Sequence, residues 1–266
     1  MQKLIARVQA ANSLLCVGLD PTGDDATVAR RLGEVIAEAA PYAAAFKPNL
    51  AFFLSRENGV ALLQQTVRSI PTDIPVILDG KFGDIANTAD QYARFAYDVL
   101  GADGVTVNPY MGDDAIVPFA RPDKFVFALA KTSNQPAHSL QDQLLQTGEP
   151  LSDFTARVIA ELDAEHGNIG LVAGATDAAA LGRLRQLCPR QWFLVPGVGA
   201  QGGDLAAVLA AGLRADGSGL LINASRSIWQ AADAGAAARA LRDEINVGRS
   251  SVDSASPRVE RLQPLN

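Results

Sequence analysis

Residues 76–101 read VILDGKFGDIANTADQYARFAYDVLG and contain the pattern that decides the fold. The stretch opens with the apolar run Val76-Ile77-Leu78, passes through a polar segment with two glycines, and continues as an amphipathic sequence. Over residues 84–100, apolar residues recur at spacings of three and four, which is typical of a helix with one buried face. Gly101 is a suitable helix stop. The stretch therefore predicts a buried strand followed by a helix.

The same pattern of strand and helix repeats along the whole chain. Continuous apolar runs suit the strands of a parallel sheet, which are buried on both faces. Strands that alternate with helices imply right-handed parallel crossovers. The predicted strands are 14–17, 43–46, 76–78, 105–107, 125–128, 169–172, 192–195 and 220–222. The predicted helices are 25–39, 54–69, 84–100, 153–164, 177–187, 203–211 and 227–242.

Eight such units in a chain of 266 residues predict an α/β fold, the (β/α)8 TIM barrel with eight parallel strands. A doubly wound open sheet is the alternative, but it usually has fewer strands in a domain of this size, and no GxGxxG motif follows the first strand. We expect a single barrel over residues 1–246, with a lengthened fifth loop at 131–150. The polar C-terminal tail, 247–266, is expected to pack loosely or to be disordered.

Composition excludes several classes of protein. A content of 48% hydrophobic and 20% charged residues excludes a disordered or fibrous chain. No apolar run is long enough to predict a transmembrane helix, and the N-terminus lacks the features of a secretory signal. The two cysteines, Cys16 and Cys188, indicate neither a disulfide framework nor a Cys-based zinc site. We therefore expect a cytoplasmic globular protein.

The charge balance bears on possible partners. A net charge of −6 and a pI near 5.0 argue against binding of a nucleic-acid polymer or of a membrane through a polybasic patch. The same balance does not exclude a small anionic ligand, because a few cations gathered in one pocket can reverse the local field.

The densest cluster of charged residues follows the third predicted strand. Active sites of TIM barrels lie at the carboxyl ends of the strands. Because side chains alternate along a strand, Asp79 and Lys81 are expected to point together into the barrel mouth, with Asp84 just beyond. Two carboxylates around one ammonium would be costly to bury for packing alone. The structural alternative is an N-cap at Asp84 and an ion pair between Asp79 and Lys81, but the position at a strand end favours function.

The loops after the seventh and eighth predicted strands suggest a phosphate site. These two loops commonly bind phosphate in TIM barrels. The loop 196–203 is rich in glycine and opens a predicted helix, so we expect free backbone N–H groups there. Arg226 in the next loop offers a guanidinium group that matches phosphate oxygens in a two-pronged contact.

In these motifs the sequence resembles the orotidine 5'-phosphate decarboxylase family. The family signature, D-x-K-x-x-D followed by I-x-N-T, is present as Asp79, Lys81, Asp84, Ile85, Asn87 and Thr88. The resemblance continues in order at GLDP (18–21), FKPN (46–49), LAKTSN (129–134), PGVGAQGG (196–203) and NASRSI (223–228). The length and the long fifth loop resemble the longer bacterial branch of that family, from which Phe82 departs because arginine is frequent there.

The resemblance implies decarboxylation of orotidine 5'-monophosphate to uridine 5'-monophosphate and CO2 in de novo pyrimidine biosynthesis, with neither a metal nor an organic cofactor. It implies that Lys81 stabilises and protonates a carbanion at C6 of the pyrimidine. Asp79 would lie near the departing carboxylate and hold Lys81 in place. Lys47 would bind the ribose and extend an alternating Lys-Asp-Lys-Asp array.

The resemblance also implies contacts with the rest of the substrate. Asp20 would accept a hydrogen bond from a ribose hydroxyl, and Ser133 would bind the amide edge of the pyrimidine. Gln201 and Arg226 would bind the phosphate.

The family's shared active site implies a homodimer, in which Asp84 and Thr88 reach the site of the partner subunit. Two other functions stay open on the sequence. A related phosphosugar lyase would use a similar D-x-K-x-x-D motif to hold Mg²⁺ and an enediolate, although the Thr132-Ser133 pair and the I-x-N-T continuation argue against it. A non-catalytic phosphate-binding or assembly protein on the same barrel would bind nucleotide without turnover.

Overall fold

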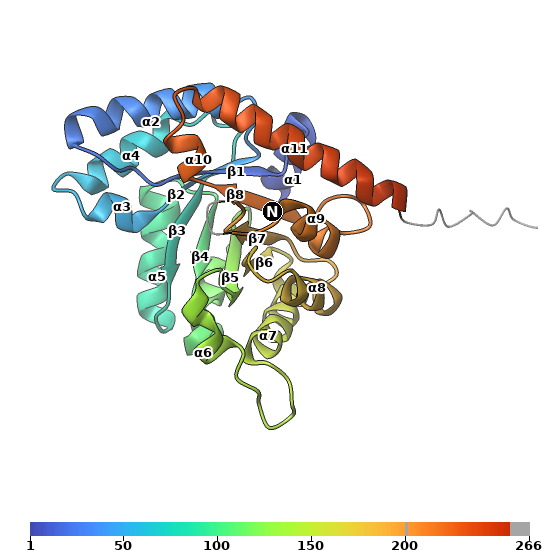
Figure 1. Cartoon of the computed structure of the whole chain (residues 1–266). Helices are drawn as coiled ribbons and strands as arrows, with labels where there is room; N and C mark the ends of the chain where they lie inside the picture. The colour runs from blue at the N-terminus through green and yellow to red at the C-terminus, as the bar shows by residue number, and fades with distance from the viewer. Residues whose placement is uncertain (200–201, 256–266) are drawn as a thin grey trace, which may run out of the picture.

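Eight parallel strands form the centre of the protein, in a computed structural model that describes residues 1–199 and 202–255 (Figure 1). Neighbouring strands follow the order β2-β1-β8-β7-β6-β5-β4-β3. Two isolated parallel bridges, Phe46–Val76 and Asn49–Asp79, join β2 to β3 and close the barrel. The (β/α)8 TIM barrel is confirmed, and the open-sheet alternative is wrong. The strands are β1 (Leu15–Leu19), β2 (Ala45–Pro48), β3 (Ile77–Phe82), β4 (Gly104–Val107), β5 (Phe125–Lys131), β6 (Ile169–Ala173), β7 (Phe193–Pro196) and β8 (Leu220–Ala224).

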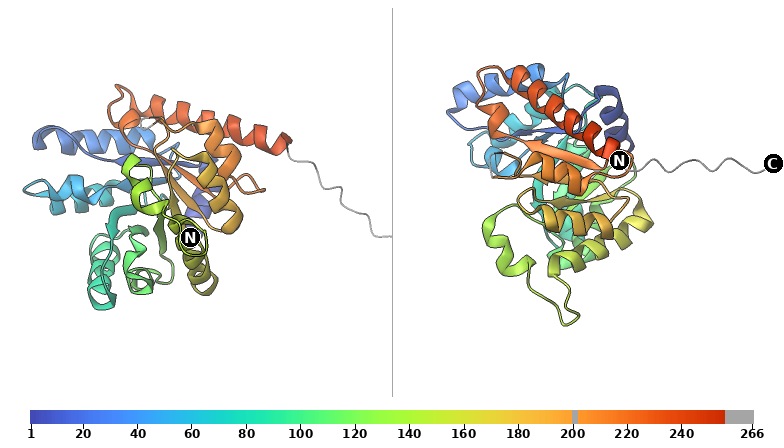
Figure 2. Two further views of the ribbon diagram at one scale, coloured as in Figure 1. Left: turned by 60° about the horizontal axis from the view of Figure 1, so that its bottom comes forward. Right: turned by 45° about the vertical axis from the view of Figure 1, so that its right-hand side comes forward.

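Helices surround this barrel (Figure 2). Each predicted helix is present, but three are divided: 54–69 forms α3 and α4, 84–100 passes from α5 into a π-helical turn at Phe95–Val99, and 227–242 forms α10 and part of α11. The N-terminal helix α1 was not predicted. The helices are α1 (Gln2–Ala11), α2 (Asp25–Ala39), α3 (Leu50–Leu54), α4 (Gly59–Ser69), α5 (Ala86–Arg94), α6 (His138–Gln141), α7 (Leu151–His166), α8 (Ala178–Leu187), α9 (Leu205–Gly212), α10 (Arg226–Trp229) and α11 (Ala234–Ala255).

Most strands continue beyond the apolar run that predicted them. The run 76–78, for example, belongs to a strand that ends at Phe82, and the run 125–128 to one that ends at Lys131. Many of the added residues are polar or small, such as Asp79, Gly80 and Lys131, because the carboxyl end of a barrel strand faces the mouth rather than the packed interior. Hydrophobicity alone therefore marks where these strands begin better than where they end.

The C-terminal helix is longer than predicted. α11 continues to Ala255, so residues 247–255 of the expected loose tail are helical, and residues 256–266 lie outside the described residues. Ile245 is fully buried, the Asn246 side-chain amide donates to the Asn12 carbonyl at 2.8 Å, and the Arg249 guanidinium donates to the Gly217 carbonyl at 2.9 Å. α11 lies across α2 and α9 on the outside of the barrel (Figures 1 and 2). Beyond Ile245 the printed contacts come from long polar side chains, which is why hydrophobic periodicity did not predict this extension.

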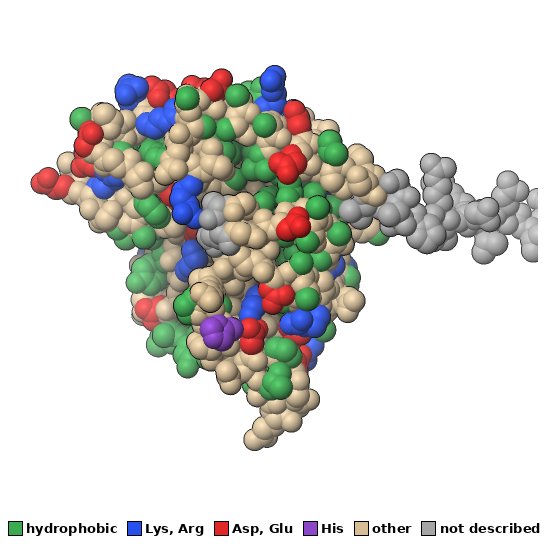
Figure 3. All heavy atoms as spheres, in the orientation of Figure 1, with side chains coloured by type: hydrophobic (Ala, Val, Ile, Leu, Met, Phe, Trp, Pro, Cys, Tyr) green, Lys and Arg blue, Asp and Glu red, His purple; other side chains and the backbone are tan. Residues whose placement is uncertain are grey.

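The surface carries mixed charge. Acidic and basic side chains are interspersed over the face shown in Figure 3, in keeping with the modest net charge of −6. Within the part of the chain that the structure describes, no helix combines the length and hydropathy needed to cross a bilayer.

A glycine in β6 permits close packing of the barrel interior. A Cβ atom on Gly170 would lie 2.4 Å from the carbonyl oxygen of Trp192 and 2.9 Å from the ring of Phe127. Both neighbours are buried, and the carbonyl belongs to the backbone that leads directly into β7. The neighbouring strand therefore has no freedom to accommodate a side chain here.

We expect Gly170→Ala to lower the free energy of unfolding by about 1–3 kcal/mol, because overpacking of a rigid interior forces the backbone to shift. Gly33 is the matched control, because it lies exposed within α2 with open space around its Cβ position. Gly33→Ala should be neutral or stabilising by up to about 1 kcal/mol. Urea unfolding followed by circular dichroism measures both, and equal midpoints for the two variants would contradict the packing described.

Candidate active site

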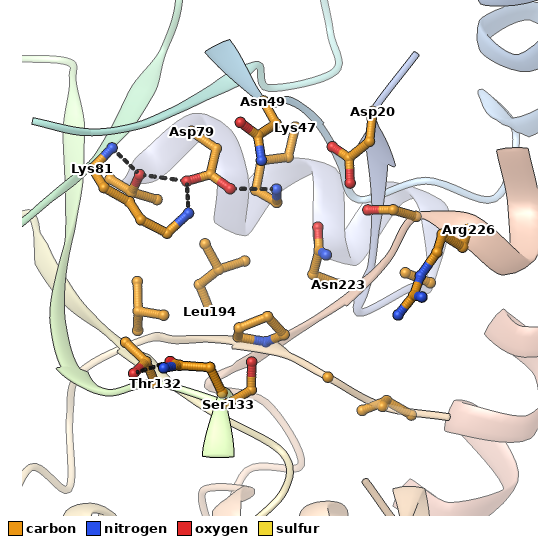
Figure 4. Close-up of a pocket in the computed structure, with 18 of the residues that line it drawn as sticks. Asp20, Lys47, Asn49, Asp79, Lys81, Thr132, Ser133, Leu194, Asn223 and Arg226 are labelled. Atoms are coloured by element: carbon orange, nitrogen blue, oxygen red, sulfur yellow. Dashed lines mark hydrogen bonds and ion pairs between the residues drawn. The ribbon is translucent and has the colours of Figure 1, made fainter. Parts of the chain in front are cut away.

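A cavity of about 320 Å³ opens at the carboxyl ends of the strands (Figure 4). The residues that line it come from several different strand ends, so residues far apart in the sequence meet there. Six of the predicted site residues line this cavity: Asp20, Lys47, Asp79, Lys81, Ser133 and Arg226.

One wall of the cavity carries the charged side chains of Lys47, Asp79 and Lys81 and is called the charged wall below. The buried carboxylate of Asp79 lies at its centre. The Lys47 Nζ is 2.7 Å from one oxygen of Asp79, and the Lys81 Nζ is 2.8 Å from the other. The Thr106 hydroxyl donates to the second oxygen at 2.8 Å. Asp79 is 7% exposed and Lys47 4%, whereas the side chain of Lys81 is 49% exposed. Of the two ammonium groups, the one on Lys81 is therefore the more accessible to a ligand.

The charges next to Asp79 and Lys47 keep both side chains ionised. Burial by itself would raise the pKa of Asp79, but the adjacent ammonium groups of Lys47 and Lys81 outweigh burial and hold that pKa well below its usual range. Burial would likewise lower the pKa of Lys47, and the attraction of Asp79 and Asp20 outweighs it, so that pKa is raised. Near neutral pH, Asp79 is therefore a carboxylate and Lys47 an ammonium ion.

The backbone at Lys81 departs from regular strand geometry. Its φ is 44°, in the left-handed region that residues with a side chain rarely adopt. The pairing of β3 with β4 shifts register between Leu78 and Phe82, and the Lys81 N–H donates to the Thr106 hydroxyl at 2.9 Å. Asp79 and Lys81 thus meet as predicted, but through an irregular strand end rather than through simple alternation. Such strain clusters at functional sites, where surrounding contacts hold it.

Aromatic rings pack against Phe82, the last residue of this strand. The Phe82 ring lies 5.1 Å from the ring of Tyr92 and 5.5 Å from that of Phe119, both stacked. The buried Tyr97 packs edge-on against Phe119 and donates to its carbonyl at 3.0 Å. Phe82 therefore fills an apolar site between aromatic rings.

The opposite wall and the far end of the cavity are polar. Figure 4 shows Thr132 and Ser133 across the cavity from the charged wall, with Asp20 and Arg226 at another side. Among the residues that the structure describes, one buried carboxylate oxygen of Asp20 has no hydrogen-bond partner, and the same holds for the side-chain oxygen of Asn223. Buried acceptors without partners are costly unless a ligand satisfies them. These two oxygens therefore mark positions where a bound molecule would donate hydrogen bonds.

The glycine-rich loop after β7 differs from its prediction. The N–H groups of Gly199, Gly202 and Gly203 are not free, because each donates to a carbonyl within the loop at 2.8–3.1 Å. The Asp204 carboxylate caps the start of α9 by accepting from two N–H groups of its first turn. The expectation of free donors from this loop is therefore wrong at these positions, since a glycine-rich sequence satisfies its own backbone when it folds into tight turns.

Two predicted site residues that the structure describes, Asp84 and Thr88, do not line the cavity. The half-buried carboxylate of Asp84 accepts a hydrogen bond from the Ile85 N–H at 2.8 Å, and Thr88 is exposed on α5. Gln201 lies outside the described residues.

The lining residues that were not predicted from the sequence include Asn49, Thr106 and Asn223. Asn49 also caps α3 by accepting from the Ala51 N–H, which is the role its sequence context suggests first. Thr106 lies within an apolar run, where a polar residue on a fully buried strand is itself a signal. Asn223 follows the last apolar run in the same way, so polar residues within or just after buried runs would have identified two of the three.

Residues 13–241 match the family described as "Orotidine 5'-phosphate decarboxylase / HUMPS family". The chain belongs to this family. A curated orotidine 5'-phosphate decarboxylase from Thermomicrobium roseum is 42% identical over 270 residues, covering 94% of this chain and 96% of that protein. The predicted family, fold and carboxy-lyase class are confirmed.

Solved structures of the orotidine 5'-phosphate decarboxylase family share the barrel closely. Leishmania donovani OMP decarboxylase matches with a TM-score of 0.88 and 47% identity, covering 94% of this chain and 98% of that chain. Leishmania donovani UMP synthase matches with a TM-score of 0.89 and 49% identity over 93% of this chain. This chain spans 56% of the UMP synthase chain, so the likeness extends to part of that larger protein.

We expect Asp79→Asn to lower the free energy of unfolding at pH 7 by about 3–5 kcal/mol, because it leaves the buried Lys47 ammonium without its counter-ion. The pKa of Asp79 is lowered by folding, from an unfolded value of about 3.9. Its contribution is therefore present above about pH 4 and is lost as the pH falls toward the folded pKa. The difference between wild type and variant should narrow between about pH 5 and pH 2.

Urea unfolding at several pH values measures this difference. Asp73→Asn is the control, because Asp73 pairs with Arg7 at a similar distance of 2.7 Å but is 66% exposed. Exposed pairs contribute little, so this variant should stay close to wild type. A difference for Asp79→Asn that widens toward low pH would show that the carboxylate is not held ionised by its neighbours.

Proposed function

We propose that this chain decarboxylates orotidine 5'-monophosphate to uridine 5'-monophosphate and CO2 in the cytoplasm, as a step of de novo pyrimidine biosynthesis. The observation that carries the proposal is the Lys47–Asp79–Lys81 array around a buried carboxylate, which lies at the barrel mouth of a chain from the decarboxylase family. Such an array supplies fixed charge at the place where charge develops during the reaction.

The proposed chemistry uses the side chains of this array. The bond between C6 and the carboxylate breaks, CO2 leaves, and the electron pair stays on C6. The Lys81 ammonium stabilises that pair and then donates its proton to C6, which gives the product. Asp79 faces the departing carboxylate, and its ion pair fixes the position of Lys81. Because Lys47 and Asp79 are already ordered and desolvated, little reorganisation is needed when the carbanion forms.

The proposed substrate fits the remaining polar groups of the cavity. The buried oxygen of Asp20, which has no partner in the described part of the chain, would accept from a ribose hydroxyl, and Lys47 would donate to the ribose. Ser133 would bind the amide edge of the pyrimidine from the wall opposite Lys81. Arg226, with Gln201, would bind the phosphate, which provides binding energy far from the reacting carbon.

We further propose a homodimer in which Asp84 and Thr88 complete the partner's site, giving the full Lys-Asp-Lys-Asp array. Both residues lie at the surface, beside Ile85, whose side chain is 58% exposed. The loop after β4 adds Tyr110, which is 80% exposed, and it begins where the Asn108 N–H bonds to the carboxyl end of β3. Exposed apolar side chains around a carboxylate favour an interface between subunits.

We expect Lys81→Ala to lower kcat for orotidine monophosphate by at least about a thousandfold, because it removes both the carbanion's counter-charge and its proton donor. Lys3→Ala is the control, since Lys3 pairs with Asp103 away from the cavity. Loss of the substrate's absorbance measures turnover, with and without EDTA. Undiminished turnover in Lys81→Ala would overturn the mechanism.

The same assay distinguishes the two alternative functions. A requirement for metal together with activity on a keto-sugar phosphate would favour the phosphosugar lyase. Nucleotide binding without turnover would favour the non-catalytic protein.

We expect inactive Lys81→Ala and Asp84→Ala variants to regain activity when mixed. In a heterodimer, one site then combines an intact Lys81 with the partner's intact Asp84, so random exchange restores about a quarter of all sites. If Asp84 acted within its own subunit, the heterodimer would contain no intact site. The measurement is the turnover of the mixture after subunit exchange has been demonstrated with labelled protein. No recovery after exchange would contradict the shared site.

A further inference from the structure

We propose that Gln141, on the short helix α6 of the lengthened fifth loop, is a positioning residue for recognition of the pyrimidine ring. It holds the Thr132–Ser133 segment in place, so that Ser133 faces the substrate. The inference rests on the proposed function, in which Ser133 binds the edge of the ring.

The side-chain amide of Gln141 forms two hydrogen bonds with Thr132. Its side-chain oxygen accepts from the Thr132 N–H at 2.8 Å, and its side-chain nitrogen donates to the Thr132 hydroxyl at 2.8 Å. The Thr132 hydroxyl in turn donates to the Asn134 side chain at 2.7 Å. One amide group therefore fixes both the backbone and the side chain of the residue before Ser133. Gln141 does not line the active-site cavity, so it acts through Thr132 rather than on the substrate.

A second contact anchors the same part of the loop. Asp142, the residue after Gln141, forms an ion pair with Lys131, the last residue of β5. The Lys131 side chain is 7% exposed, so this pair is largely shielded from water on the lysine side. Two successive residues of the loop are thus bonded to two successive residues at the end of β5. This explains how a long connection can hold a fixed position over the strand end.

The other side of Ser133 is held by the end of β6. A Cβ atom on Gly174 would lie 2.7 Å from both the N and the Cα of Ser133, so the absence of a side chain there lets the two segments touch. The Thr176 hydroxyl donates to the Ser133 carbonyl at 3.2 Å. Ser133 is therefore fixed from two sides through its backbone, and its hydroxyl makes no hydrogen bond within the described part of the chain. That hydroxyl is available to a ligand in the cavity.

Removal of the Gln141 side chain should therefore weaken recognition of the ring and leave recognition of the sugar phosphate intact. Asp20, Lys47 and Arg226 come from other strand ends. We expect Gln141→Ala to raise the Kd of uridine monophosphate about fivefold to tenfold, the range for loss of neutral hydrogen bonds that order a binding segment. The Kd of ribose 5-phosphate should change by less than about twofold.

Titration calorimetry of both ligands with the full chain measures this selectivity. Gln143→Ala is the matched control, because Gln143 lies in the same loop with an exposed side chain, and both ligands should bind it as they bind wild type. A double variant gives an independent readout: in a Ser133→Ala background, Gln141→Ala should change the Kd of uridine monophosphate by less than about twofold, because its effect passes through Ser133. If Gln141→Ala does not fold, Gln141→Asn repeats the test with an amide too short to reach Thr132.

Equal weakening of the two ligands, an unchanged Kd for uridine monophosphate, or full additivity with Ser133→Ala would overturn the positioning role. The proposed function fails separately, if wild type does not decarboxylate orotidine monophosphate or if Ser133→Ala binds uridine monophosphate as tightly as wild type. Where wild type is active and Ser133→Ala loses affinity while Gln141→Ala does not, only the role of Gln141 is wrong.

Discussion

The site depends on one buried interaction, the carboxylate of Asp79 between the ammonium groups of Lys47 and Lys81. No member of this set could be buried alone, because an isolated charge in a protein interior is strongly unfavourable. The interaction also depends on how the barrel closes. Lys47 lies on β2 and Asp79 on β3, the two neighbours that isolated bridges join rather than a continuous ladder. The charges therefore meet at the two strands that isolated bridges join, and the Lys47–Asp79 ion pair spans this junction.

The features that could be predicted from the sequence are those encoded by residues close together along the chain. Each strand is a local apolar run, and the Asp79–Lys81 pair lies within three residues, so the barrel and the charged wall could both be predicted. Prediction from the sequence failed where the outcome depends on distant contacts. Whether the N–H groups of the 196–203 loop are free depends on how the loop turns back on itself, and the length of α11 depends on carbonyls near residues 12 and 217. The left-handed backbone at Lys81 depends on the Thr106 hydroxyl of a neighbouring strand.

The side chains that line the cavity come from strands that are far apart in the sequence. The charged wall belongs mainly to β2 and β3, the wall with Ser133 follows β5, and Arg226 follows β8. Each group is held by its own local contacts: Thr106 holds Asp79, and Gln141 holds Thr132. This separation lets one part of the site change without disturbing the others. It also explains why a long fifth loop can be accommodated, since the loop is anchored at the strand end that it serves.

The pairing of β1 with β8 has a consequence for how the chain folds. Leu15 pairs with Ile222, and α11 then reaches back to Asn12, so the first strand obtains its second neighbour only from the end of the sequence. During synthesis, β1 leaves the ribosome long before β8 and presents an unpaired edge in the meantime. Contacts of such long sequence separation form slowly, and exposed strand edges favour association with other chains. The time until β8 and α11 are made is thus the period in which this protein is most exposed to aggregation.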